Sequence, residues 1–167
     1  VFLEFQRFAQ LDRWISVLEE LLAGAPVFAD ANAELRVYAA LVGAILQRKG
    51  NPPALEKYVA RTLNLLQQAS DANLQVAAAT YLLRYGTVVG CMGVARQTLA
   101  LIEPILADPD VTPLRRGLCE SFVAWFYVNV PREAQAREAI ERLDRFGLEQ
   151  ELPRLRWFAA IAGYWLE

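Results

Sequence analysis

The chain has 167 residues, of which 55% are hydrophobic and 22% charged, and its 17 basic and 19 acidic residues give a net charge of −2. A chain of this length and composition can fold around a buried core, so the composition excludes an intrinsically disordered protein. The mixed charges form neither a basic surface for nucleic acid nor a polybasic membrane patch, so we expect direct contact with neither.

Apolar residues recur at intervals of three and four along almost the whole chain, which is typical of amphipathic helices. Residues 1–9 are interpreted as the tail of a preceding helix. The breaks predict further helices over about 11–22, 32–49, 53–69, 71–89, 94–106, 113–130, 133–146 and from 153 onward. Gly50 is expected to end one helix, and Thr112 to cap another that begins at Pro113. We therefore predict an all-α fold of about eight antiparallel helices.

A tripeptide marks the start of two of these helices. Asp30-Ala31-Asn32 returns later in the chain as Asp71-Ala72-Asn73. The two tripeptides are 41 residues apart, and Thr112-Pro113 lies 41 residues after Asp71-Ala72. Pro153 lies 40 residues after Pro113. A period of about 40 residues with two helices in each unit is typical of helical-repeat solenoids. Short oxygen-bearing side chains recur there because they satisfy free N–H groups at helix starts, so we interpret the tripeptide as a capping signal and not as a binding motif.

The second helix of each unit places small residues before large apolar ones: Ala54, Tyr58 and Leu63; Ala95, Leu99 and Ile102; Ala136, Ala139 and Leu143. This pattern resembles the second helix of tetratricopeptide repeats, although the usual unit is about 34 residues long. The longer version here, rich in Ala, Leu and Arg, is similar to helical-repeat regions of large bacterial LuxR-type, ATP-dependent transcriptional regulators.

The resemblance implies a right-handed α-α superhelix that bears on a nucleotide-switch domain and a DNA-binding domain. On this interpretation residues 1–167 are a single helical-repeat domain and a fragment of a larger multidomain protein. The sequence itself contains neither a P-loop nor a recognition-helix pattern.

The sequence offers little catalytic chemistry. It contains no histidine, which excludes Ser–His and Cys–His nucleophile pairs and histidine zinc sites. Cys91 and Cys119 are interpreted as structural thiols, and their number favours a reducing cytoplasm over a disulfide framework. The glycines of "GTVVGCMGVA" lack phosphate-loop spacing and are interpreted as a helix end with close packing. We expect neither an enzyme nor a metal or other cofactor.

Arginine, aromatic and amide side chains on the first helix of each unit are the candidates for a partner- or ligand-binding groove. In solenoids of the type that the chain resembles, the first helices line the concave surface, and arginines and aromatic residues anchor partners there. The alternative is that the aromatic residues belong to the core and the arginines are solvated. The candidates are Arg36, Tyr38, Arg84, Tyr85, Arg115, Arg116, Trp125, Asn129, Arg156 and Trp157.

We therefore expect a non-catalytic interaction or signal-relay module whose partner is a protein segment or a neighbouring domain of the same chain. The alternative is a sensor that encloses a small-molecule effector. A sensor would show a deep pocket lined by these arginines and aromatic residues, whereas an interaction module would show an open groove. A homodimer through the apolar faces of the terminal helices is a third arrangement.

Overall fold

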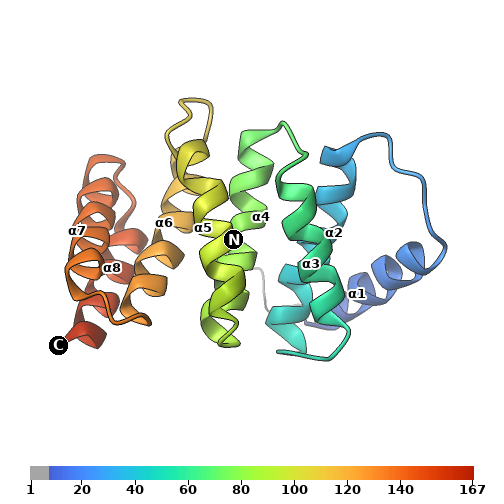
Figure 1. Cartoon of the computed structure of the whole chain (residues 1–167), viewed down its shortest axis with the longest axis horizontal. Helices are drawn as coiled ribbons and strands as arrows, with labels where there is room; N and C mark the ends of the chain where they lie inside the picture. Colours follow the sequence, from blue (N-terminus) through green and yellow to red (C-terminus); the bar gives the residue numbers. More distant parts are fainter. Residues whose placement is uncertain (1–7) are drawn as a thin grey trace.

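The computed structural model describes residues 8–167, and these residues form eight α-helices (Figure 1). In chain order they are α1 (Phe8–Ala23), α2 (Ala31–Arg48), α3 (Leu55–Leu66), α4 (Ala72–Val88), α5 (Met92–Leu106), α6 (Pro113–Val128), α7 (Glu133–Glu149) and α8 (Pro153–Leu166). The all-α prediction is confirmed for this part of the chain. Most of the tail expected over residues 1–9 lies outside the described residues, and Phe8 and Ala9 belong to α1. None of the described helices is long and apolar enough to span a membrane.

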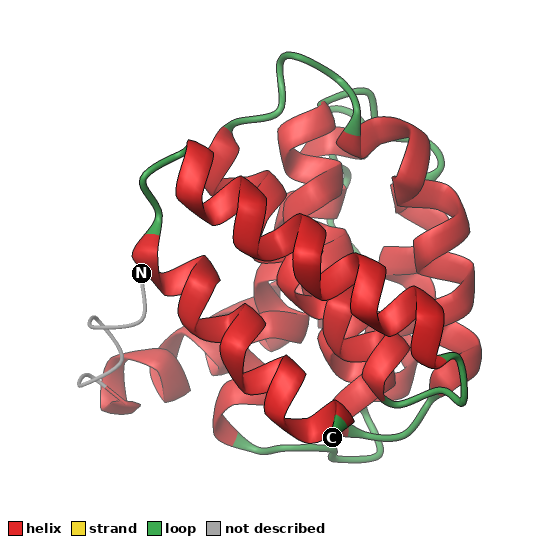
Figure 2. Cartoon of the chain, turned by 90° about the vertical axis from the view of Figure 1, so that its left-hand side faces the viewer, coloured by secondary structure: helices red, strands yellow, loops and turns green. Residues whose placement is uncertain are grey.

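Helix pairs follow one another along the long axis of the molecule, from α1 at one end to α7 and α8 at the other (Figure 1). Figure 2 views the same packing from the C-terminal end. Within pairs, α2 packs on α3, α4 on α5, and α6 on α7. Between pairs, the first helices pack side by side, α2 on α4, α4 on α6 and α6 on α8, whereas α3 and α5 touch much less. This arrangement is compatible with a helical repeat.

The helix ends follow the predicted capping residues in most places. Asp30 accepts a hydrogen bond from the backbone N–H of Ala33 at 2.7 Å, and Asp71 accepts one from Leu74 at 3.0 Å. Gly50 follows α2 with a φ of +68°, the left-handed conformation that glycine adopts without steric cost. Thr112 occupies the predicted cap position of α6, but its side chain makes no capping hydrogen bond.

Some expected boundaries are wrong by two or three residues, and two of them show why. Helix α3 begins at Leu55 instead of Pro53, because residues 52–54 form a turn closed by a hydrogen bond from the Leu55 N–H to the Pro52 carbonyl. Helix α7 continues through Gly147 to Glu149, because Gly147 lets α8 approach closely instead of ending the helix. A Cβ atom at Gly147 would lie 3.1 Å from the Arg156 backbone nitrogen.

The asparagine of each repeated tripeptide ties its helix to the start of the next pair. The Asn32 side-chain oxygen accepts hydrogen bonds from the backbone N–H groups of Ser70 at 3.0 Å and Asp71 at 3.1 Å. Asn73 repeats the arrangement one unit later. Its oxygen accepts from the Thr112 N–H at 3.0 Å, and its amide nitrogen donates to the Asp110 carbonyl at 2.7 Å. The interpretation of the tripeptide as a capping signal alone was therefore incomplete, since its third residue fixes the register between neighbouring pairs.

The third unit lacks this bond. Leu114 stands one repeat after Asn73, and its side chain is 49% exposed. The apolar core divides near the same junction. One large cluster extends from Ile15 of α1 to Phe126 of α6, and a smaller one joins Ala124 of α6 to α7 and α8. Gly117 of α6 lets α8 approach, because a Cβ atom there would collide with the Leu155 side chain.

Replacing either asparagine by alanine is expected to lower the free energy of unfolding by about 1–2 kcal/mol, because each substitution leaves backbone groups without their partner. Urea denaturation of Asn32→Ala and Asn73→Ala measures this change. The matched control is Asn64→Ala in α3, whose amide oxygen accepts only from Arg61 and Gln68 of its own helix or the turn that follows it. It should change stability by less than about 0.5 kcal/mol. Equal effects at all three positions would contradict the tethering role.

Candidate functional site

An apolar hollow lies where α4, α6 and α8 meet, and we call it the C-terminal hollow. It has a volume of about 280 Å³. Its lining consists of Val88 of α4, Ser121, Phe122 and Trp125 of α6, and Trp157, Phe158 and Ile161 of α8. All the contributing helices are the first helices of their units. The hollow is therefore a product of the side-by-side packing of equivalent helices.

The residues of the hollow follow helical spacing within each helix and the repeat spacing between helices. Phe122 and Trp125 are three positions apart, and Trp157 and Ile161 four apart, so each pair projects from one face of its helix. Trp165 lies one repeat after Trp125 and packs edge-on against it, with ring centroids 6.2 Å apart. Equivalent positions of neighbouring units thus place their tryptophan rings in contact.

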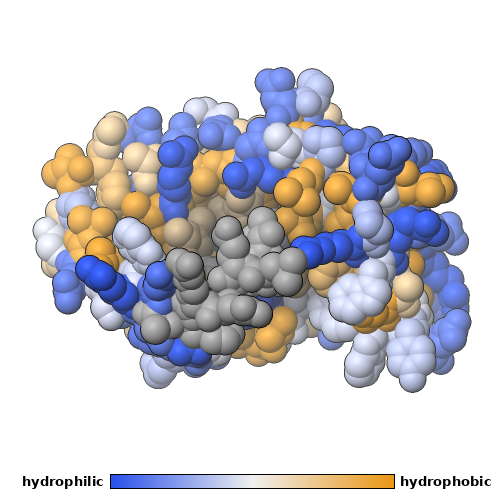
Figure 3. Space-filling view, turned by 180° about the vertical axis from the view of Figure 1, so that it is seen from behind, coloured by the Kyte–Doolittle hydropathy of each residue, from blue (hydrophilic) through white to orange (hydrophobic). Residues whose placement is uncertain are grey.

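Large apolar side chains at the hollow remain in contact with solvent. Val88 is 66% exposed, Trp157 is 60% exposed and Trp165 is 66% exposed. Figure 3 shows the molecule from behind, with the C-terminal helices at the right-hand end. Pale ring side chains project from the surface there, beside orange apolar groups. A cluster of exposed apolar residues of this kind marks an interaction site more often than single exposed side chains do.

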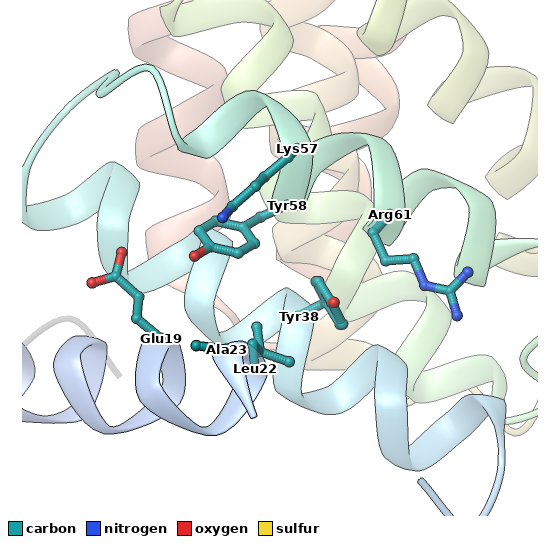
Figure 4. A pocket seen from close by; sticks show the side chains of 7 residues that line it. All are labelled: Glu19, Leu22, Ala23, Tyr38, Lys57, Tyr58 and Arg61. Carbon is teal, nitrogen blue, oxygen red and sulfur yellow. The ribbon is translucent and has the colours of Figure 1, made fainter. Parts of the chain in front are cut away.

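A second pocket of about 250 Å³ lies between α1, α2 and α3 (Figure 4). Tyr38 of α2 and Tyr58 of α3 meet there with ring centroids 6.2 Å apart, and the Lys57 ammonium lies 4.8 Å from the centroid of the Tyr58 ring. Arg61, at the edge of the pocket, forms a two-point hydrogen bond with Glu34 at 2.7 Å for each contact. Its aromatic and charged groups largely satisfy one another, so the pocket offers few free polar groups to a ligand.

A third cavity of about 420 Å³ opens between α5, α6 and the turn before α7. Its walls include Arg96, Glu103, Tyr127 and Arg132. Burial, followed by the charge of Glu103, raises the pKa of the Tyr127 hydroxyl above its usual value. The cavity mixes both signs of charge with apolar groups, and we call it the outer cleft.

The structure distributes the predicted groove residues over several places. Trp125 and Trp157 line the C-terminal hollow, and Tyr38 lines the pocket of Figure 4. Four of the arginines are engaged within the chain: Arg84 with Gln47, Arg115 with the Asn73 carbonyl, Arg116 with the Asp108 carbonyl, and Arg156 with Asp144. Arg36 is exposed on α2, and Asn129 donates to the Trp125 carbonyl at the end of α6. The expected residues therefore do not line one continuous groove.

Tyr85 is a correction to the predicted site. Its side chain is 4% exposed and packs in the large core cluster, so it presents no surface to a partner. Burial, together with a hydrogen bond from the Cys91 thiol at 3.4 Å, raises the pKa of Tyr85 to about 12. The preceding residue, Arg84, is only half-buried, and burial lowers the pKa of its guanidinium.

Sequence reasoning missed five residues of the lining, Val88, Ser121, Phe122, Phe158 and Ile161, and it missed Trp165, which packs on Trp125. Two signals were available for some of them. Trp165 stands one repeat after Trp125, and Ile161 stands one helical turn after Trp157. Val88 carried no such signal, because an aliphatic residue at the end of a helix is usually core. Val88 is the last residue of α4, and Gly90, two residues later, has a φ of +86°.

The described residues contain no group of three or more metal-ligating side chains. Compared with protein-family models, with curated proteins and with solved structures, the chain gives no match in any of the three comparisons. Evidence for its function therefore comes from the chemistry and geometry of its own surfaces.

The two thiols provide a test of the interpretation that Cys119 is structural. Cys119 is fully buried, and burial raises the pKa of its thiol to about 12. In the Cys91→Ser variant, Ellman's reagent at mildly alkaline pH should label almost no thiol in the native protein and one thiol after unfolding in urea. The Cys119→Ser variant is the control, because the half-buried Cys91 remains. Rapid labelling of native Cys91→Ser would contradict the structural role of Cys119.

Proposed function

We propose that this chain is a non-catalytic interaction module whose helix pairs form a right-handed superhelix of tetratricopeptide type. In this proposal its first helices bind a protein segment, or relay a change between neighbouring domains of the same chain. The observation that carries the proposal is the C-terminal hollow, where exposed apolar residues from three equivalent helices converge.

The superhelix is supported by the way the helix pairs are joined. First helices pack on first helices at three successive junctions, while α3 and α5 touch much less. Asn32 and Asn73, at the same position of successive units, make equivalent bonds to the next pair. In an array of this kind each unit contacts only its neighbours, so small rotations add up along its length.

Binding of a protein segment is favoured by the size and chemistry of the hollow. Small-molecule pockets usually have volumes of about 300–1,000 Å³ and bury most of their ligand. The hollow, at about 280 Å³, falls just below that range and is open to solvent through Val88 and Trp157. Tryptophan is the residue type most enriched among binding hot spots. These features fit the capture of individual apolar side chains of a protein partner.

The parent protein is proposed to be a bacterial transcriptional regulator located in the cytoplasm. The support for this part is the resemblance of the Ala-, Leu- and Arg-rich repeats to the helical regions of LuxR-type regulators. In such a protein the array would bear on a nucleotide-switch domain and a DNA-binding domain.

A small-molecule sensor is the second candidate, and the observation in its favour is the outer cleft. Its volume of about 420 Å³ lies within the usual range for ligands, and Arg96 and Arg132 would attract an anionic group. Glu103 opposes this attraction from the same wall. Its lining shares no residue with the C-terminal hollow, so the two proposals can be tested separately.

Site-specific photo-cross-linking in cells of the source organism tests the interaction proposal. A benzophenone amino acid in place of Val88 should form an adduct with one defined protein, or with another part of the same chain, identified by mass spectrometry. The matched control carries the same group in place of Gln97, an exposed residue of α5. Adducts of equal yield from both positions, or none from Val88, would contradict a binding surface on the first helices.

A further inference from the structure

We propose that the C-terminal hollow takes an acidic segment of a protein partner, one that inserts a large apolar side chain between the tryptophans of α6 and α8 and places carboxylates against Arg84 and Arg154. This inference rests on the proposed interaction function and adds the chemical class of the partner. It follows from how charge is distributed over the helices.

The first helices that build the hollow are basic. Helices α4, α6 and α8 together carry five arginines and a single acidic residue, Glu120. That carboxylate is occupied, because Arg142 of α7 donates to it at 2.9 Å. Helix α7, which contributes nothing to the hollow, carries five acidic residues and three arginines. The excess of positive charge is therefore a property of the helices that line the hollow and not of the whole chain, which has a net charge of −2.

Two of the five arginines, Arg84 and Arg154, have no carboxylate partner among residues 8–167. Arg84 precedes Val88 by one helical turn, and Arg154 precedes Phe158 by one turn, so each shares a helix face with a lining residue. Arg84 is half-buried and is held only by the neutral Gln47 amide at 2.9 Å. An arginine that is already partly desolvated gains more from a carboxylate than a fully solvated one.

The other three arginines are engaged elsewhere. Arg156 pairs with Asp144 of α7 at 3.0 Å, and Arg115 and Arg116 donate to backbone carbonyls at the other end of α6. The two arginines that remain for a carboxylate are thus one from α4 and one from α8, two of the helices that line the hollow. A segment with an apolar anchor between acidic residues complements an apolar hollow with an arginine on each of two lining helices. A basic segment would be repelled by both arginines.

Selection of random dodecapeptides displayed on phage against the immobilised full chain tests the inference. Enriched peptides should carry net negative charge and at least one Leu, Ile, Phe or Trp. Their affinity, measured by fluorescence anisotropy, should fall about tenfold or more for Trp157→Ala and for Ile161→Arg, since hot-spot truncations cost this much. For Arg154→Glu the loss should be about three- to tenfold and should shrink at high salt.

Tyr164→Ala is the matched control, because this residue is 77% exposed on the same helix and does not line the hollow. Its affinity should stay within about twofold of the wild-type value. Circular dichroism establishes that each variant is folded. Trp157→Ala removes only an exposed side chain, so it remains informative if Ile161→Arg unfolds.

The outcomes separate this inference from the function on which it rests. Enriched peptides that are basic, or that bind Ile161→Arg and Trp157→Ala as well as wild type, overturn the acidic-segment inference and leave the interaction module standing. Failure to enrich any peptide counts against the acidic-segment inference and against the interaction module. Concentration-dependent dimerisation that Ile161→Arg abolishes also overturns the inference, because the occupant of the hollow is then a second copy of the chain.

Discussion

The packing of the helix pairs depends on the side chains of Asn32 and Asn73. A primary amide has both a donor and an acceptor, so one side chain can hold groups of the following loop that have no partner within a helix. Asn32 accepts from two backbone N–H groups at the start of the next unit, and Asn73 both accepts from and donates to the equivalent loop. Because these bonds join equivalent points of successive units, they align α2, α4 and α6 in the same register. That register brings Val88 of α4 beside Phe122 and Trp125 of α6.

The last unit is attached by different means, and the C-terminal hollow lies where the attachment changes. Leu114 replaces the asparagine, and α8 is held instead by close packing of Leu155 against Gly117 and by the ion pair of Arg156 with Asp144. The smaller core cluster also belongs to this junction. A binding surface there spans two separately packed parts of the molecule. An occupant that touches both Trp125 and Trp157 would therefore affect the angle between these two parts of the molecule. A relay module requires a ligand-dependent change of this kind.

Local features of the fold were readable from the sequence. Helix periodicity, the capping aspartates and the left-handed Gly50 each depend on residues within a few positions of one another. The second task of Asn32 was not readable in the same way, because its partners belong to the next unit of the chain and a capping explanation already accounted for the tripeptide.

The candidate site was only partly predictable for the same physical reason. Trp125 and Arg84 were expected on the binding face, and they do occupy equivalent positions of successive units. Tyr85, adjacent to Arg84, is buried, because successive residues of a helix point about 100° apart and Tyr85 lies on the face of α4 that packs in the large core cluster. The position of Val88, Phe122 and Trp157 around one hollow depends on the tertiary packing of three helices, which the pattern within one helix does not determine.

In the proposed function, partners bind across the first helices at the junction of the last two units. Hydrogen–deuterium exchange of the full chain, with and without a peptide enriched on it, measures this most directly. We expect slower exchange in the C-terminal half of α4, in α6 and in α8, with α3 and α5 unchanged. Protection confined to α3, α5 and α7, or to the pocket between α1, α2 and α3, would contradict it.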